Sequence, residues 1–245
     1  QTCALPIWRR EQHAGFLLLS LLLFVLALLT AEAALAVAAY MGAWVLCIEK
    51  QSLPRKVLPL LPVIAVILLW RGAYDAGGFG ALNIGQYVDP GRSPKDFLLN
   101  FVSVFPLIAF SQISGIDTLI MYVHPQQQWQ LVALGWLVAI GGVWLIWPLL
   151  KANASDRFWF VGSLVAAIPG TALISAESRT VTFSAIGFFY LLAKWLVHLY
   201  RQRQRWLPRW TFRLVLGWHG VLPLLIAVVM TSGVSGFSQL SKQNQ

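Results

Sequence analysis

Long apolar runs constrain the fold of this chain more than any other feature of its sequence. Two of them are GFLLLSLLLFVLALL at residues 15–29 and VLPLLPVIAVILLW at residues 57–70. Charged residues make up only 11% of the chain, whereas an ordinary soluble domain carries about 25%. Such runs are stable in a lipid bilayer rather than in water. The sequence therefore predicts an all-α protein, a polytopic bundle of transmembrane helices.

About 20 mostly apolar residues are needed to cross the roughly 30 Å hydrocarbon core of a membrane. The apolar stretch 15–48 is interrupted only around Glu32, and as one helix it would be about 50 Å long. We therefore expect two short spans there, with Glu32 near a membrane surface; a single crossing is the alternative. The seven predicted spans are 15–30, 33–48, 57–71, 129–149, 157–174, 181–199 and 213–230.

The distribution of basic residues predicts the orientation of these spans. The net charge of +9 would by itself also fit a nucleic-acid partner. Five arginines gather between residues 201 and 213, and short Lys/Arg-rich loops stay on the cytoplasmic side. An additional crossing by the apolar segment 97–114 would put this loop on the outer side. We therefore expect 97–114 to run along the outer surface as an interfacial helix. The loop 200–213 is then predicted to bind anionic lipid, and no nucleic acid is expected.

The longest segment outside the predicted spans, residues 71–128, is where we expect a headgroup or phosphate site. Its DPG sequence at 89–91 predicts a tight turn, and PKD at 94–96 predicts the start of a helix. Arginine and lysine side chains neutralise phosphate. Seven of the charged side chains expected on the outer side are candidate substrate-binding residues: Glu32, Arg71, Asp89, Arg92, Lys95, Glu177 and Arg179. A turn-rich connector packed on the membrane is the alternative.

The sequence contains few ligands for metal or cofactor chemistry. GGFG at residues 77–80 is not a nucleotide-binding loop, because no GKS/T follows it and no strand precedes it. Cys47 lies alone in an apolar run, and His124 has no second ligand near it in sequence. No cofactor is evident and no metal ligands are assigned, although the sequence leaves a divalent metal open.

Three stretches carry a resemblance to a group of bacterial multi-span membrane proteins without established activity: LLTAEAALAVAAY (28–40), LLWRGAYDAGGFGALNIGQYVDPGRSPKDFL (68–98) and RFWFVGSLVAAIPGTA (157–172). That group in turn distantly resembles the lipid-linked-sugar glycosyltransferases of superfamily C, the protein O-mannosyltransferase type. The resemblance implies a bacterial plasma-membrane protein with an extracytoplasmic site supplied by a polyprenyl-phosphate sugar. It also places Glu32 in a family motif, although Ala31 stands where the family usually has Lys.

The resemblance further implies that the catalytic acidic residue lies in a first outer loop, which would precede Trp8. Residues 1–7 correspond, by one choice of codons, to the end of a sequencing adapter. We therefore expect 1–7 to be an artefact, 8–230 to form a transmembrane domain that lacks its N-terminal part, and 231–245 to be a polar tail.

The function predicted from these features is the C-terminal membrane portion of a polyprenyl-phosphate-sugar-dependent glycosyltransferase-like protein, with its catalytic residues unknown. A non-catalytic scaffold of envelope assembly is the first alternative. A transporter or flippase is the second, and the almost entirely apolar interiors of the predicted spans disfavour it.

Overall fold

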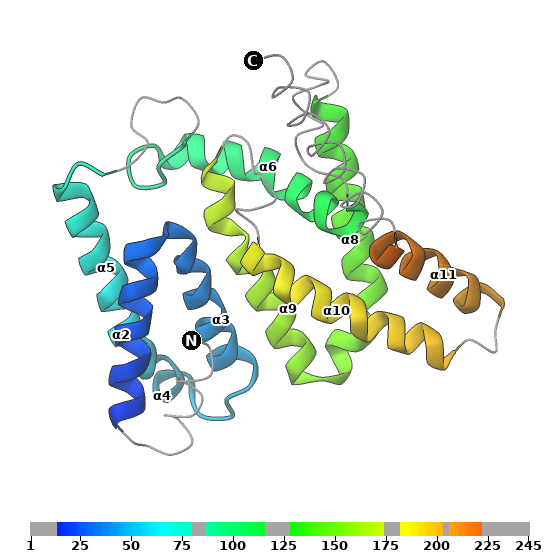
Figure 1. Ribbon diagram of the computed structural model, residues 1–245, viewed down its shortest axis with the longest axis horizontal. Coiled ribbons are helices and arrows are strands. Elements are labelled where there is room, and N and C mark those ends of the chain that lie inside the picture. The colour runs from blue at the N-terminus through cyan, green and yellow to red at the C-terminus, as the bar shows by residue number, and fades with distance from the viewer. Residues whose placement is uncertain (1–13, 80–86, 116–127, 174–181, 203–205, 222–245) are drawn as a thin grey trace, which may run out of the picture. The chain divides into compact units, whose positions relative to one another are not determined.

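The computed structural model describes residues 14–79, 87–115, 128–173, 182–202 and 206–221 (Figure 1). These residues are helical apart from turns and an isolated antiparallel bridge between Tyr87 and Leu173. The chain divides into two compact units, residues 1–191 and 192–245. Residues 1–7 and the tail 231–245, to which the sequence assigned an artefact and a polar end, lie outside the described residues.

The elements follow one another with short connections. They are α2 (Ala14–Thr30), η1 (Glu32–Ala34), α3 (Leu35–Cys47), α4 (Leu53–Val57), η2 (Leu58–Leu60), α5 (Leu61–Ala76), α6 (Pro94–Ser114), α8 (Gln128–Ala152), α9 (Ala154–Ala166), η4 (Ile168–Ala172), α10 (Thr182–Arg201), α11 (Trp206–Leu216) and η6 (Gly217–Val221).

Among the described residues, four helical segments are long and apolar enough to cross a membrane: Pro54–Ala76, Pro94–Ser114, Gln128–Ala152 and Thr182–Arg201. The all-helical architecture is confirmed over the described residues, and these four apolar segments support an integral membrane protein. α2 and the segment Glu32–Cys47 are apolar but shorter. Because Pro94–Ser114 is among the four, length and composition alone do not separate the predicted interfacial helix from a span.

Two predicted spans differ from the helices that the structure contains. The segment 157–174 is a helix only to Ala166, after which η4 continues as a 3-10 turn. Pro169 lies in this turn, and a proline has no backbone N–H to give to an α-helix. The segment predicted to begin at 213 already starts as α11 at Trp206, and residues 222–230 are outside the described residues.

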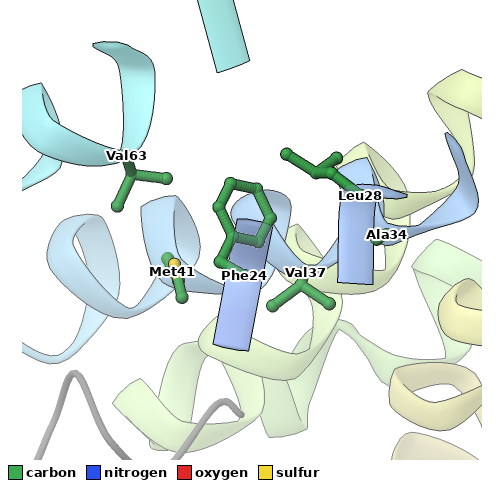
Figure 2. Close-up of a cluster of buried hydrophobic side chains, with 6 residues drawn as sticks. All are labelled: Phe24, Leu28, Ala34, Val37, Met41 and Val63. Carbon is green, nitrogen blue, oxygen red and sulfur yellow. The ribbon is translucent and has the colours of Figure 1, made fainter. Parts of the chain in front are cut away.

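The apolar stretch 15–48 forms two helices that pack on each other. Ala31 has extended backbone angles, φ −161° and ψ 134°, which end α2 before η1 begins. Side chains of α2, η1, α3 and α5 then meet in one buried cluster (Figure 2), which consists of Phe24, Leu28, Ala34, Val37, Met41 and Val63. The contact buries the facing sides of α2 and α3 and brings the start of η1 close to α5.

A tyrosine of α3 packs against α9 and bonds to the start of α10. The Tyr40 hydroxyl donates to the carbonyl of Phe183 (2.7 Å) and accepts from the N–H of Gly187 (3.1 Å). These two backbone groups are four residues apart, so the hydroxyl bridges a pair that bonds directly in a regular helix. Gly162 makes room for the ring, because a Cβ there would lie 2.3 Å from Tyr40 Cδ1.

α6 crosses α8 at a proline. Pro106 has no N–H to donate to the carbonyl of Val102, four residues before it. The indole Nε1 of Trp136 in α8 donates to that carbonyl instead, at 3.2 Å. Gly135 lies against the backbone of Pro106, so α8 both approaches α6 closely and satisfies the carbonyl that the proline leaves free.

Candidate functional site

Charged and aromatic residues gather where the end of α5, the start of η1 and the turn before α6 meet. We call Glu32, Arg71, Tyr74, Asp75 and Asp89 the Arg71 network. Arg71, Tyr74 and Asp75 belong to the last turns of α5, Glu32 is the first residue of η1, and Asp89 opens the turn that leads to α6. Three of the predicted site residues are therefore brought together from positions up to 57 apart in sequence, from 32 to 89.

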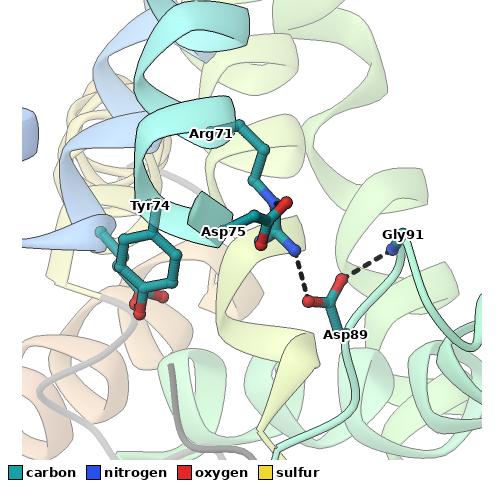
Figure 3. A network of polar contacts seen from close by, with 6 residues as sticks. Arg71, Tyr74, Asp75, Asp89 and Gly91 are labelled. Carbon is teal, nitrogen blue, oxygen red and sulfur yellow. Dashed lines mark hydrogen bonds and ion pairs between the residues drawn. The ribbon is translucent and has the colours of Figure 1, made fainter. Parts of the chain in front are cut away.

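Arg71 is held between two carboxylates. Its Nε lies 3.0 Å from Asp75 Oδ2, one helical turn along α5, and its Nη2 donates to Asp89 Oδ2 (Figure 3). The side chain of Arg71 is 30% exposed and that of Asp89 11% exposed. Two charge-assisted contacts of this kind fix the guanidinium in place. Arg71 therefore links α5 to the turn before α6 and has little of its charge left for a phosphate.

Asp89 organises the turn that contains it. Its Oδ1 accepts from the N–H of Gly91 at 2.7 Å, and its carbonyl accepts from the N–H of Ser93 at 2.9 Å. Burial on its own favours the protonated acid, but the hydrogen bonds from Arg71 and from the backbone outweigh it and hold the pKa of Asp89 below its ordinary value. Asp89 is thus a carboxylate at neutral pH, and the turn predicted at 89–91 is confirmed.

Glu32 is exposed at the surface and is bonded to Tyr74, which the sequence analysis did not select. The Tyr74 hydroxyl donates to Glu32 Oε1. The Tyr74 ring packs between Trp70, at a centroid separation of 5.1 Å, and Phe79, at 5.8 Å. A tyrosine at the end of an apolar helix is common at a membrane interface, so nothing in its local sequence distinguished Tyr74 as the partner of a carboxylate 42 residues away.

The turn before α6 is also attached to the end of η4. The N–H of Val88 donates to the carbonyl of Ala172 at 2.7 Å. The side-chain amide of Asn100 donates to the carbonyls of Thr171 (2.6 Å) and Leu173 (3.0 Å). Three consecutive carbonyls of this segment are therefore satisfied from residues 88–100, which holds the Arg71 network beside the end of η4.

Tyr87, beside this attachment, experiences the charges of the network. Burial raises the pKa of its phenol, and the carboxylates of Glu32 and Asp89 raise it further, against the opposing effect of Arg71. Tyr87 is therefore neutral at physiological pH. It can donate a hydrogen bond at this site but cannot act there as an anion.

The remaining candidates fall into two groups. Arg92 and Lys95 are exposed, in the turn and in the first turn of α6. Within the part of the chain that the structure describes, neither side chain forms an ion pair. Glu177 and Arg179 lie outside the described residues, and so does His124. Among the described residues no group of three or more His, Cys, Asp and Glu side chains is arranged to hold a metal ion.

A second polar cluster, at the start of α9, was missed by the sequence analysis, whose predicted span begins only at residue 157. Asp156 is 0% exposed. Its Oδ2 accepts from Asn153 Nδ2 (3.1 Å) and its Oδ1 from the Tyr190 hydroxyl (3.2 Å). Asn153 is the N-cap residue of α9 and Asp156 lies in its first turn, but their bond joins the two side chains and is not a helix cap, so no capping motif in the sequence indicated it. The cluster ties α9 to α10 and contains no free group for chemistry.

Comparison with known proteins identified no relative of this chain. No family model, no curated protein and no solved structure matches the chain. The function is therefore argued below from the residues and contacts of the site.

Proposed function

We propose that Arg92 and Lys95, the two cations in the turn that the Arg71 network holds, recognise the phosphate headgroup of a polyprenyl-phosphate sugar. In this proposal the chain is the C-terminal membrane portion of a glycosyltransferase-like protein, in the bacterial plasma membrane. The observation that carries it is the contrast between Arg71, which two carboxylates occupy, and the exposed Arg92 and Lys95 beside it. The network holds the turn, while Arg92 and Lys95 are exposed, form no ion pair with any described residue and are available to bind an anion.

The position of these cations suits a lipid-linked ligand. Lys95 lies in the first turn of α6, whose following residues Leu98, Leu99 and Val102 are more than half exposed. A polyprenyl phosphate keeps its tail in hydrocarbon and its charged group at the membrane surface. A cation at the polar end of an exposed apolar helix meets both parts of such a molecule, and an arginine fork matches the phosphate oxygens.

Replacing both cations by glutamine (R92Q/K95Q) is expected to weaken binding of undecaprenyl phosphate by about five- to thirty-fold. This assigns about 0.5–1 kcal/mol to each exposed charge, where the contact is screened by water. The measurement is a titration of the full chain in phosphatidylcholine nanodiscs with undecaprenyl phosphate, followed by intrinsic tryptophan fluorescence or by native mass spectrometry.

The matched control is R55Q/K56Q, which also removes two positive charges. Arg55 and Lys56 lie at the beginning of the segment Pro54–Ala76 and Arg71 near its end, so a helix that crosses the membrane separates them from the proposed site. Binding that is unchanged in R92Q/K95Q, or equally reduced in the control, contradicts the proposal.

We further propose seven spans, with α6 lying along the outer surface. This topology is supported by the arginine-rich stretch 201–213, which belongs on the cytoplasmic side. It is also supported by the course of α6 in Figure 1, where it runs across the direction of α2, α5 and α8. The polar side chains Asn100 and Gln112 along α6, both hydrogen-bonded to other elements, are easier to accommodate at an interface than in mid-bilayer.

Cysteine labelling distinguishes the two placements of α6. In a background without the native cysteines (C3S/C47S), R92C and S114C are placed at opposite ends of the helix. A thiol reagent that does not cross membranes is expected to label both from the outer side of intact cells. Labelling of the two positions from opposite sides of the membrane would instead make α6 a span and would reverse the side assigned to α11.

A scaffold role is the second candidate, and one observation favours it. The carboxylates of Asp75 and Asp89 and the guanidinium of Arg71 satisfy one another, as the residues of a structural joint do. The binding measurement separates the two functions, because a scaffold requires the network but not the exposed charges of Arg92 and Lys95.

A further inference from the structure

The second unit contains a short helix with an unusual distribution of charge. α11 spans Trp206–Leu216 and continues into η6, so the arginine-rich stretch that the sequence analysis treated as a loop is helical from Trp206 onward. Arg209 and Arg213 are four residues apart, which places them on the same face of α11. Both side chains are exposed.

A tryptophan accompanies these arginines. The guanidinium carbon of Arg213 lies 5.6 Å from the centroid of the Trp210 ring, a cation–π contact. Trp210 is itself 47% exposed. The same pairing occurs in α8, where Lys151 Nζ lies 5.4 Å from the Trp147 ring. Tryptophan beside a basic side chain is typical of residues at the headgroup level of a membrane.

The apolar residues of α11 and η6 are exposed as well. Leu214 is 69% exposed, and Leu216, Trp218 and Val221 are each about half exposed. A helix with arginines on one face and large apolar side chains on another suits the boundary between headgroups and acyl chains, with its apolar side toward the acyl region. The side chains of α11 are therefore arranged for a lipid surface.

The arginines of this unit have no acidic partner in their own part of the chain. No Asp or Glu follows Glu177, whereas Arg179, Lys194, Arg201, Arg203, Arg205, Arg209, Arg213 and Lys242 all do. Within the described residues neither Arg209 nor Arg213 forms an ion pair. Residues 178–245 therefore depend on counter-ions from outside this segment, and a surface of anionic headgroups supplies them continuously.

We propose that α11 binds the phosphate groups of anionic phospholipids in the cytoplasmic leaflet through Arg209 and Arg213, with Trp210 and Leu214 in the adjoining acyl region. The two guanidinium groups, one helical turn apart, contact the phosphate oxygens. This site is independent of the one proposed at the Arg71 network. It makes the association of α11 with the membrane depend on lipid charge.

The experiment uses the full chain in nanodiscs that contain equal parts of phosphatidylglycerol and phosphatidylcholine. Native mass spectrometry then measures which lipids stay bound when the disc is removed. The wild-type chain is expected to retain phosphatidylglycerol in preference to phosphatidylcholine. The variant R209Q/R213Q is expected to lose this preference by about five-fold for each arginine removed, the usual effect of one basic residue at an anionic surface.

Two variants make the result specific to α11. R55Q/K56Q removes the same charge elsewhere and is expected to keep most of the preference. R209K/R213K keeps the charge and is expected to restore most of it. The proposal is overturned if the wild type retains the two lipids in their mixing ratio. It is also overturned if R209Q/R213Q keeps the preference for phosphatidylglycerol, or if R55Q/K56Q loses it to the same extent. Because both substituted side chains are exposed, R209Q/R213Q is expected to fold like the wild type. A circular dichroism spectrum checks this.

Discussion

Replacing Asp156 by alanine is expected to lower the free energy of unfolding by about 2–4 kcal/mol. The carboxylate is 0% exposed and accepts hydrogen bonds from Asn153 and Tyr190. Its loss removes two charge-assisted bonds and takes this acceptor away from the Tyr190 hydroxyl, which is partly buried. The position also loses a negative charge in the first turn of α9, where it interacts favourably with the helix dipole.

α6 offers a matched control for this change. Asp96 is the third residue of α6, as Asp156 is the third residue of α9, but Asp96 is exposed. D96A therefore removes the same interaction with a helix dipole without the buried hydrogen bonds, and it is expected to cost less than about 1 kcal/mol. Unfolding in mixed micelles, with increasing denaturing detergent and far-ultraviolet circular dichroism as readout, gives both values.

Two further variants identify the source of the effect. D156N keeps the shape and one acceptor oxygen, so an intermediate loss is expected. Y190F removes only the donor and is expected to cost about 1 kcal/mol. If D156A is no more destabilising than D96A, the buried hydrogen bonds contribute nothing measurable and the cluster does not hold α9 to α10.

Local features of the structure could be predicted from the sequence because their causes are local. The apolar runs indicated membrane helices, and four segments of suitable length and composition are present. PKD at 94–96 indicated a helix start, and α6 begins at Pro94, where a missing N–H costs nothing. The DPG sequence indicated the turn at 89–91, which forms around the side chain of Asp89.

Contacts between distant segments could not be predicted in the same way. A soluble helix shows its packed side as an apolar stripe, but a membrane helix is apolar all round, so the pattern does not say which side meets a neighbour. Nothing near Tyr40 indicates that its hydroxyl bridges Phe183 and Gly187, more than 140 residues away. The pairing of Tyr74 with Glu32 was hidden for the same reason.

The candidate site contains both predictable and unpredictable features. Charge and position were sufficient to select Glu32, Arg71 and Asp89, which the fold brings into one network. They were not sufficient to show that Arg71 is occupied by Asp75 and Asp89 rather than free to bind phosphate. The distinction depends on which carboxylate a guanidinium reaches, and that is a property of the packing of α5 against the turn before α6.

Replacing Gly135 by alanine is expected to destabilise the protein by about 1–3 kcal/mol, although alanine favours a helix. A Cβ at this position would lie 2.6 Å from the carbonyl oxygen of Pro106 and 2.8 Å from its carbonyl carbon. These are backbone atoms of α6, so the clash is relieved only if the two helices move apart, which is the cost of overpacking. The hydrogen bond from Trp136 to the carbonyl of Val102, at 3.2 Å, would lengthen with that movement.

Gly141 in the same helix provides the control, because a Cβ there meets nothing within 4 Å. G141A is expected to be neutral or to stabilise the protein by up to about 1 kcal/mol, the difference in helix propensity between the two residues. Thermal unfolding of the two variants in the same detergent compares them directly.

W136F tests whether the hydrogen bond from Trp136 also stabilises this crossing. The substitution leaves the Val102 carbonyl without a donor, because Pro106 has no N–H to supply one. Equal stabilities of G135A and G141A would mean that α6 and α8 do not approach each other as closely as the fold requires. If only G135A and W136F lower the thermal stability, the crossing of α6 and α8 depends on both residues. The glycine lets the two helices approach closely, and the indole satisfies the Val102 carbonyl that Pro106 leaves without a donor.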